Sequence, residues 1–215
     1  MRKKIKNLAT RLLIQRGYQG FSFGDIAERL GTTRANIHYH FGNKSRLVEE
    51  VIEDYASQTL AKLQRIWLDE ATSLASKIDQ TSEFNKRTYA RYNRGARGGK
   101  SWSLITRMRW DRDFLTPKSE RTLKDFSDQL HCSVLTAVKK AQQDGEIVRG
   151  APLEDISLLV ASIISSAGFT TQDAASFQRL EQLYATVSHI IESAYGVKDK
   201  KDPAGGNVRR LKLSG

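Results

Sequence analysis

Apolar residues recur along most of the chain at the three- and four-residue spacing that marks one face of a helix. The first such stripe comprises Ile5, Leu8, Ala9, Leu12 and Leu13. Gly17 follows this stripe and is expected to end the helix in a left-handed cap. No run alternates apolar and polar residues as a half-buried strand does. The pattern therefore predicts an all-α fold.

A short second helix is expected from about Phe23 to Leu30. Ser22 can cap its N-terminus, with Asp25 as the capping-box partner three residues later. Gly31 follows and is free to adopt a positive φ. The pattern predicts a helix that starts and stops sharply.

A third helix is expected from about Arg34 to His40, with Thr33 as its N-cap and Gly42 as its break. Asn43 can then cap a long fourth helix that reaches Trp67. Two short helices joined by a tight glycine-containing turn are typical of a helix-turn-helix. The alternative is an ordinary small helical hairpin.

The rest of the chain predicts further helices. The expected segments are 82–93, 102–110, a helix that Pro117 opens and Gly145 stops, 153–169, and a stripe from Leu180 to Ala194. Residues 94–101 form a loop by their glycines. The segment 153–169 is apolar nearly all round and is expected to be buried on more than one side.

Charge adds a candidate partner. The 215 residues carry a formal net charge of +11. In residues 1–50, ten Lys or Arg oppose four Asp or Glu, which leaves +6. A basic excess favours double-stranded DNA over anionic lipid or small anions, although a soluble protein can also simply be basic.

The third helix carries side chains suited to DNA. Arg34 can donate two hydrogen bonds to a guanine, and Asn36 can pair with an adenine edge. The rings of His38, Tyr39 and His40 can contact phosphates, sugars or thymine methyl groups. Lys44, at the start of the next helix, can reach a phosphate.

The segment "FSFGDIAERLGTTRANIHYHFGNKSRLVEEVI" resembles the N-terminal signature of TetR-type transcriptional regulators. The resemblance implies a ligand-responsive regulator, most often a repressor, that binds a palindromic operator as a homodimer. His38 departs from it, because the family usually has a tyrosine there. The DNA contacts it implies are Ser22, Thr33, Arg34, Asn36, His38, Tyr39, His40 and Lys44.

The resemblance also implies a division into a DNA-binding domain (1–47), a helical effector-binding and dimerisation domain (48–196) and a basic tail (197–215). The last two helices are expected to form the dimer interface, although the first of them could instead be central in the core of one chain. The predicted interface residues are Leu158, Leu159, Ser162, Ile163, Ser166, Leu183, Val187, Ile190 and Ile191.

An unknown small-molecule effector is expected among the middle helices. Its candidate contacts are the aromatic, soft or basic residues Trp67, Tyr89, Tyr92, Trp102, Met108, Arg109, Trp110 and Phe126. Residues 86–112 also hold nine Lys or Arg against Asp111 alone, which leaves +8. This cluster is either a solvated face or the contact for an anionic effector or partner.

Other classes of function are disfavoured. No Gly-rich phosphate loop or nucleophile elbow occurs, so no cofactor and no catalytic residue is expected. A metal site from His38, His40 and His131 or His189 lacks supporting carboxylate spacing. Cys132 is the only cysteine and no long uninterrupted apolar run occurs, so a cytoplasmic protein without a membrane partner is expected. A non-specific architectural DNA-binding protein remains the alternative to a specific regulator.

Overall fold

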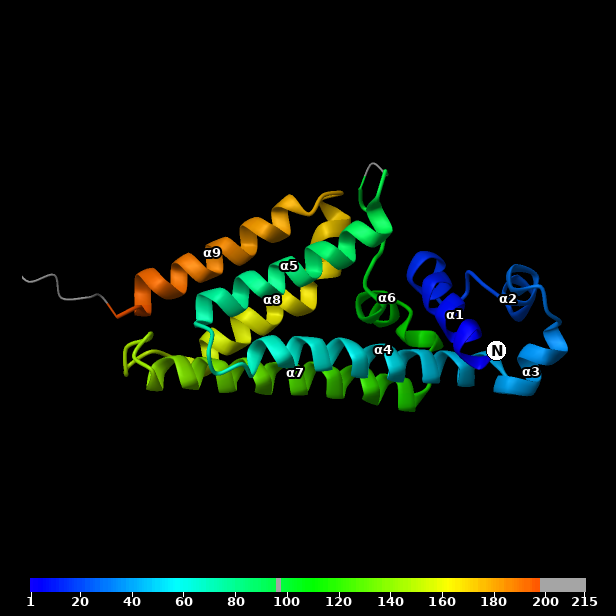
Figure 1. The fold of residues 1–215 in the computed structure, drawn as a ribbon, viewed down its shortest axis with the longest axis horizontal. Coiled ribbons are helices and arrows are strands. Elements are labelled where there is room, and N and C mark those ends of the chain that lie inside the picture. The colour runs from blue at the N-terminus through cyan, green and yellow to red at the C-terminus, as the bar shows by residue number, and fades with distance from the viewer. Residues whose placement is uncertain (96–97, 198–215) are drawn as a thin grey trace, which may run out of the picture.

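The computed structural model describes residues 1–95 and 98–197 and confirms the all-α fold (Figure 1). The first four helices are α1 (Arg2–Arg16), α2 (Phe23–Leu30), α3 (Arg34–Phe41) and α4 (Lys44–Trp67). The next elements are α5 (Leu74–Asn93), α6 (Leu104–Trp110) and a 3-10 turn (Arg112–Phe114). The last three helices are α7 (Pro117–Gln143), α8 (Leu153–Asp173) and α9 (Gln178–Tyr195).

Local signals define α2 and α3 as predicted. Ser22 and Asp25 form the expected capping box, in which each side chain accepts from the other residue's backbone N–H. Gly31 then takes the left-handed conformation at φ 60° and ψ 41°. The Thr33 side chain caps α3 by accepting from the backbone N–H of Asn36. The turn between the two helices is therefore determined by short-range contacts.

One prediction about the N-terminal unit needs correction, and the predicted domain boundary can be placed on the structure. Gly17 ends α1 with a positive φ of 75°, but its ψ of −176° is extended, so it is not the predicted left-handed cap. The predicted domain boundary after residue 47 falls inside α4, which is one continuous helix. The first residues of α4 pack on α1 and α3, while its remainder packs on α7. One continuous helix thus joins the N-terminal unit to the larger bundle.

The larger bundle is built on the long pair of α4 and α7, which lie side by side (Figure 1). The helix α8 packs between α7 and α9, and α5 covers α9. The short helix α6 contacts α1, α4 and α8 and so lies at the junction of the two units. A core of buried apolar side chains runs through both units without a break.

Helix boundaries in the bundle differ from those predicted. The helix predicted from residue 82 begins at Leu74, because Ser73 caps it and Lys77 is buried as its ammonium bonds the backbone oxygens of Ile66 and Asp69. Because this buried residue is a lysine, it interrupts the apolar stripe. The hydrophobic pattern therefore does not reveal the first two turns of α5. The helix α8 also continues to Asp173, past the predicted end at 169.

The first residue of the predicted tail, Val197, is hydrogen-bonded to the bundle. The backbone N–H of Val197 donates to the Glu146 oxygen, and Gly196 forms an isolated bridge with Ile147. Residues 198–215, which hold the rest of the predicted tail, lie outside the described residues.

In the described part of the chain, α8 is the one helix long and apolar enough to cross a membrane by length and composition. Only 39% of its most apolar window is buried inside the chain. Its packing between α7 and α9 is that of a bundle helix, and its uncovered side chains are considered below as an interface.

Candidate nucleic-acid interface and effector cavity

The helix α3 is anchored by two buried residues and presents the rest of its surface to solvent. Ile37 and Phe41 are buried, whereas the Tyr39 side chain is 85% exposed, the most exposed of the large apolar side chains. The rings of Tyr39 and His40 lie 5.5 Å apart, edge to face. An exposed aromatic ring at this position is free to contact a large partner.

Arg34 packs against the start of α2. A Cβ atom added to Gly24 would lie 2.6 Å from Nη2 of Arg34, so the guanidinium occupies the space that the glycine leaves open. The exposed Arg34 side chain forms no ion pair among the described residues. It is therefore available to a base or a phosphate after a change of rotamer.

Three of the residues predicted to contact DNA form hydrogen bonds within the protein. The Asn36 amide donates to Oγ1 of Thr32 at 2.8 Å, and the Thr33 hydroxyl serves as the α3 cap. The Ser22 hydroxyl donates to Asp25 at 2.6 Å. The hydrogen bond from Ser22 holds the pKa of the Asp25 carboxyl below its usual range. These residues shape the turn, and any base contact by Asn36 would use its remaining amide hydrogen or its oxygen.

The two histidines are placed differently. Nδ1 of His38 lies 2.8 Å from the carbonyl oxygen of Gly42 and must donate to it, while the ring packs edge to face on Phe23 at 4.8 Å. Only Nε2 of His38 is then left for DNA. His40 is half-buried between the rings of Tyr39 and Phe41.

Lys44 differs from the prediction. Its ammonium donates to the carbonyl oxygen of Phe21 and lies over the rings of Tyr18 (4.8 Å) and Phe21 (4.5 Å). Burial lowers the pKa of Lys44, and the nearby Asp25 carboxylate partly opposes this. The half-buried side chain is thus engaged with partners within the fold, the carbonyl oxygen of Phe21 and two aromatic rings.

Comparison with known proteins agrees with this geometry. Residues 5–51, which hold α1 to the start of α4, match the family model of bacterial regulatory proteins of the tetR family. By this match, the N-terminal unit is of the tetR type. Among curated relatives, the chain is 32% identical over 77 residues to the HTH-type transcriptional repressor KstR2 of Mycolicibacterium smegmatis. That match covers 36% of this chain and only 37% of the relative.

A second relative, the HTH-type transcriptional regulator AcrR of Shigella flexneri, is 42% identical over 52 residues, or 24% of each chain. Solved structures match nearly the whole fold. The regulatory protein TetR from Rhodobacter sphaeroides aligns with a TM-score of 0.75 at 14% identity, covering 87% of this chain and 96% of that one. A TetR regulator from Legionella pneumophila gives 0.71 at 20% identity, covering 89% and 97%. The family model thus covers residues 5–51, the two relatives cover 36% and 24% of this chain, and most of the bundle is matched by fold alone.

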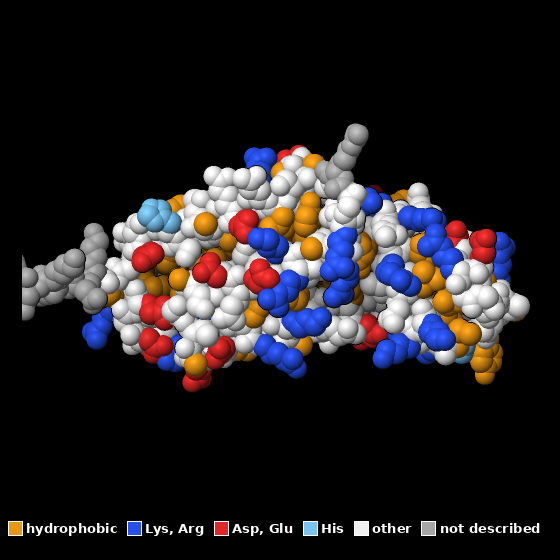
Figure 2. Space-filling model, turned by 45° about the horizontal axis from the view of Figure 1, so that its top comes forward, with side chains coloured by type: hydrophobic (Ala, Val, Ile, Leu, Met, Phe, Trp, Pro, Cys, Tyr) orange, Lys and Arg blue, Asp and Glu red, His pale blue; other side chains and the backbone are white. Residues whose placement is uncertain are grey.

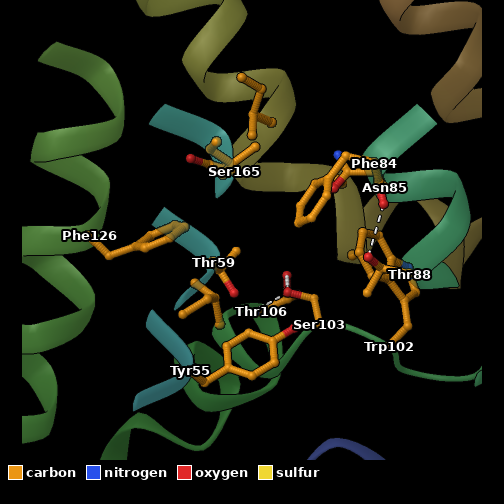
Figure 3. Close-up of a pocket in the computed structure, with 15 residues that line it drawn as sticks. Tyr55, Thr59, Phe84, Asn85, Thr88, Trp102, Ser103, Thr106, Phe126 and Ser165 are labelled. Carbon is orange, nitrogen blue, oxygen red and sulfur yellow. Dashed lines mark hydrogen bonds between the residues drawn. The ribbon is translucent and has the colours of Figure 1, made fainter. Parts of the chain in front are cut away.

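The bundle contains a small cavity of about 40 Å³ between α4, α5, α6, α7 and α8 (Figure 3). Hydroxyl, amide and apolar groups line it. Gly168 lets α6 approach α8, since a Cβ there would lie 2.4 Å from Oγ1 of Thr106. The labelled lining residues are Tyr55, Thr59, Phe84, Asn85, Thr88, Trp102, Ser103, Thr106, Phe126 and Ser165.

Only two of the predicted effector residues, Trp102 and Phe126, line this cavity. Trp67 and Met108 are buried in the core, and Trp110 is 51% exposed against Phe169. Tyr89 packs on Trp102 and Phe177. Tyr92 lines an adjoining groove, and Arg109 lines a separate one beside α7.

Sequence reasoning missed the polar lining residues. Thr59, Thr88, Ser103, Thr106 and Ser165 are short polar residues at helix positions that turn inward. A signal existed, because short hydroxyl residues near apolar stripes are candidates for a cavity wall. The prediction rested on large aromatic and soft residues, of which Trp67 and Met108 fill the core and Trp110 is exposed.

The predicted interface residues fall into two groups. Leu158 (57%), Leu159 (46%), Leu183 (37%) and Ile190 (48%) are exposed large apolar side chains, and Ser162 is exposed as well. Ile163 and Ser166 are half-buried. Val187 and Ile191 are buried inside the chain's own core, so they have no surface to offer a second copy. The apolar residues predicted along α9 therefore lie on two faces of the helix, one against the core and one toward solvent.

The basic side chains gather mainly over the N-terminal unit and the middle of the molecule, whereas the acidic ones lie mostly toward the other end (Figure 2). Most of the predicted basic cluster of 86–112 lies on α5 and α6. Arg97 of that cluster lies outside the described residues. In the described chain, no group of three or more His, Cys, Asp or Glu residues could hold a metal ion.

Proposed function

We propose that this protein is a TetR-family, ligand-responsive transcriptional regulator that binds a palindromic DNA operator as a homodimer. The observation that carries the proposal is the exposed face of α3 in a basic helix-turn-helix unit, where Tyr39 and Arg34 stand free of the core. A helix presented in this way fits the major groove. We also propose that the protein binds DNA in the cytoplasm and has no membrane partner.

The exposed apolar face of α8 and α9 supports the homodimer. Leu158, Leu159, Leu183 and Ile190 leave apolar area in water that a second copy would cover. A two-fold dimer through this face would carry two recognition helices. Such helices contact half-sites roughly 34–36 Å apart, which requires a palindromic site.

The cavity between α4, α5 and α8 supports effector control. The helix α4 also packs on α3. A ligand that moves α4 in the bundle would therefore move the recognition helix α3. A ligand regulates only through its different affinities for the DNA-bound and free conformations. Repression is the direction we propose, since the relative KstR2 is named a transcriptional repressor.

Selection from a random duplex pool at physiological salt tests the proposal. We expect the wild-type protein to enrich a palindrome, and Arg34→Ala to lose or relax one position in each half-site. Arg65→Ala is the matched control, because Arg65 is an exposed arginine of α4 outside the N-terminal unit. If wild type and Arg34→Ala enrich no sequence, the specific regulator is contradicted.

The alternative is a non-specific architectural DNA-binding protein, which the charge of +11 favours. Salt dependence separates the two. A binder that relies on phosphates loses nearly all its affinity as salt rises, whereas a specific regulator keeps a large preference for its own site. Equal salt slopes and equal affinities on the selected and scrambled duplexes would favour the architectural protein.

A further inference from the structure

A wide groove adjoins the small cavity on the side of the DNA-binding unit. It has a volume of about 700 Å³ and is bounded by α1, α4 and α5. Tyr55, Thr59, Phe84 and Thr88 line both the groove and the cavity, so these four side chains form the wall between them. A molecule that enters the cavity from the groove has to pass these residues.

The groove and the cavity differ in charge. Among the described residues, no charged side chain lines the cavity. The groove is lined by five cations and a single acid, Asp54. Asp54 is engaged by Lys6, and the groove residue Arg87 pairs with Glu83 at 2.6 Å.

Three groove cations remain without an acidic partner. In the described chain, no carboxylate oxygen lies within 4.0 Å of Arg11, Lys62 or Arg91. They come from three different helices, α1, α4 and α5 respectively. Cations on three sides of one groove, without acids to neutralise them, attract an anion.

Two of these arginines, Arg11 and Arg91, line the groove together with Tyr55 and Tyr92. Burial raises the pKa of Tyr92, while the positive charges of Arg91 and Arg11 oppose that rise. Burial likewise raises the pKa of Tyr55 to about 12, and Arg91 acts against this too. Both phenols therefore stay protonated at neutral pH and can donate hydrogen bonds beside the arginines.

We propose that the effector is an amphipathic anion, whose carboxylate or phosphate is held by Arg11, Lys62 and Arg91 in the groove and whose apolar part enters the cavity beyond Tyr55. This inference rests on the proposed function, in which the cavity receives an effector. It narrows the effector to one chemical class and separates the head-group site from the apolar site.

The size of the cavity links this class to regulation. An apolar cavity of roughly 150 Å³ takes up benzene, so a cavity of about 40 Å³ cannot hold an aromatic ring or an alkyl chain unless its walls move. The head group would at the same time tie α1, in the DNA-binding unit, to α5 in the bundle. The ligand would thus affect the junction of the two units twice. Its apolar part would move the cavity walls, and its head group would tie α1 to α5.

The test measures direct binding to the full-length protein, by calorimetry, with probes that share a tail. The probes are octanoate, octanol and octylammonium, and then 2-naphthoate and 2-naphthol. We expect at least one carboxylate to bind ten times or more tighter than its uncharged and cationic analogues. Equal or tighter binding of the alcohols or the ammonium, or no binding by any probe, would overturn the proposal.

Charge-neutral variants locate the head group. Lys62→Gln and Arg91→Gln lie outside the DNA-binding unit, and together they should weaken carboxylate binding at least tenfold while leaving alcohol binding unchanged. Arg65→Gln is the matched control on α4 and should leave both unchanged. An equal loss in Arg65→Gln would show a general charge effect and overturn the site.

Operator binding of the same variants is measured without any probe. If carboxylates bind as expected but the protein selects no DNA sequence, the proposed regulatory function fails while the anion site stands. If the protein selects its operator but only uncharged or cationic probes bind, the regulator stands and the anion site fails.

Discussion

The backbone N–H of Tyr18 donates a hydrogen bond to Oδ2 of Asp111 at 2.7 Å, across 93 residues of sequence. Tyr18 lies between α1 and α2 in the DNA-binding unit, and Asp111 ends α6, whose first residues line the cavity. The Tyr18 ring stacks on Phe114 at 5.8 Å, and its hydroxyl bonds the Ser45 hydroxyl at 2.9 Å. Tyr18 therefore links two helices: its backbone bonds the end of α6, and its hydroxyl bonds the start of α4.

Asp111→Ala should weaken this junction. The substitution leaves the Tyr18 N–H without its acceptor and removes the ion-pair partner of Arg107 at 3.6 Å. Because this hydrogen bond is only partly buried, its loss should cost about 1 kcal/mol of unfolding free energy, the low end of the range for a donor left without a partner, which denaturant titration would measure. Asp113→Ala is the control, because Asp113 is exposed in the neighbouring turn. Equal stability of the two variants would contradict a structural role for the contact.

Gly17→Ala should destabilise the protein more than Gly31→Ala. Both glycines have positive φ, but a Cβ on Gly17 would lie 2.4 Å from Nη2 of Arg107 and 2.6 Å from Oδ2 of Asp111. Gly31 has no neighbour within 4 Å of its added Cβ. We expect Gly31→Ala to lower the free energy of unfolding by about 1–2 kcal/mol from backbone strain alone. The loss should be larger for Gly17→Ala. Thermal and denaturant unfolding measure both, and a reversed order would contradict close packing at Gly17.

Tyr39→Ala should reduce operator affinity without affecting folding. The side chain is 85% exposed, so the unfolding free energy should change by no more than about 0.5 kcal/mol. A dimer would lose two contacts of about 1 kcal/mol each, which corresponds to roughly thirtyfold in affinity. Fluorescence anisotropy on the selected duplex measures this. Unchanged affinity would show that α3 does not approach DNA through this face.

Leu158→Glu should yield a folded monomer. Leu158 is 57% exposed in the single chain, so the substitution should leave the helical content intact while placing a carboxylate in the proposed two-fold interface. Sedimentation velocity should show a lower association state, together with weaker binding to the palindrome. Leu68→Glu, at a 47% exposed leucine that ends α4, is the control and should stay dimeric. A dimer that survives Leu158→Glu would place the interface elsewhere.

The capping box of α2 should contribute a pH-dependent stability. The Ser22 hydrogen bond lowers the folded-state pKa of Asp25, so the ionised form is favoured by folding. The contribution is present above the ordinary value of 3.8 and is lost as pH falls through the lower folded-state pKa. The stability difference between wild type and Asp25→Asn should therefore be constant near neutral pH and shrink in acid. A difference that grows as the pH falls would contradict this sign.

Short-range signals allowed much of the N-terminal unit to be predicted. Ser22, Gly31 and Thr33 act on their immediate neighbours, so their roles follow from sequence spacing alone. The start of α5 was missed for the opposite reason. Lys77 is buried because distant backbone oxygens satisfy it, and no local pattern shows that.

The candidate site divides in the same way. The sequence by itself determined the all-α fold and the recognition helix α3, because helical periodicity and capping are properties of neighbouring residues. Only the tertiary structure decided that Lys44 turns inward, that Val187 faces the core while Ile190 faces solvent, and that Thr59 and Thr106 line a cavity. Which side of a helix is covered depends on how separate helices pack, and that arrangement comes from contacts far apart in the sequence.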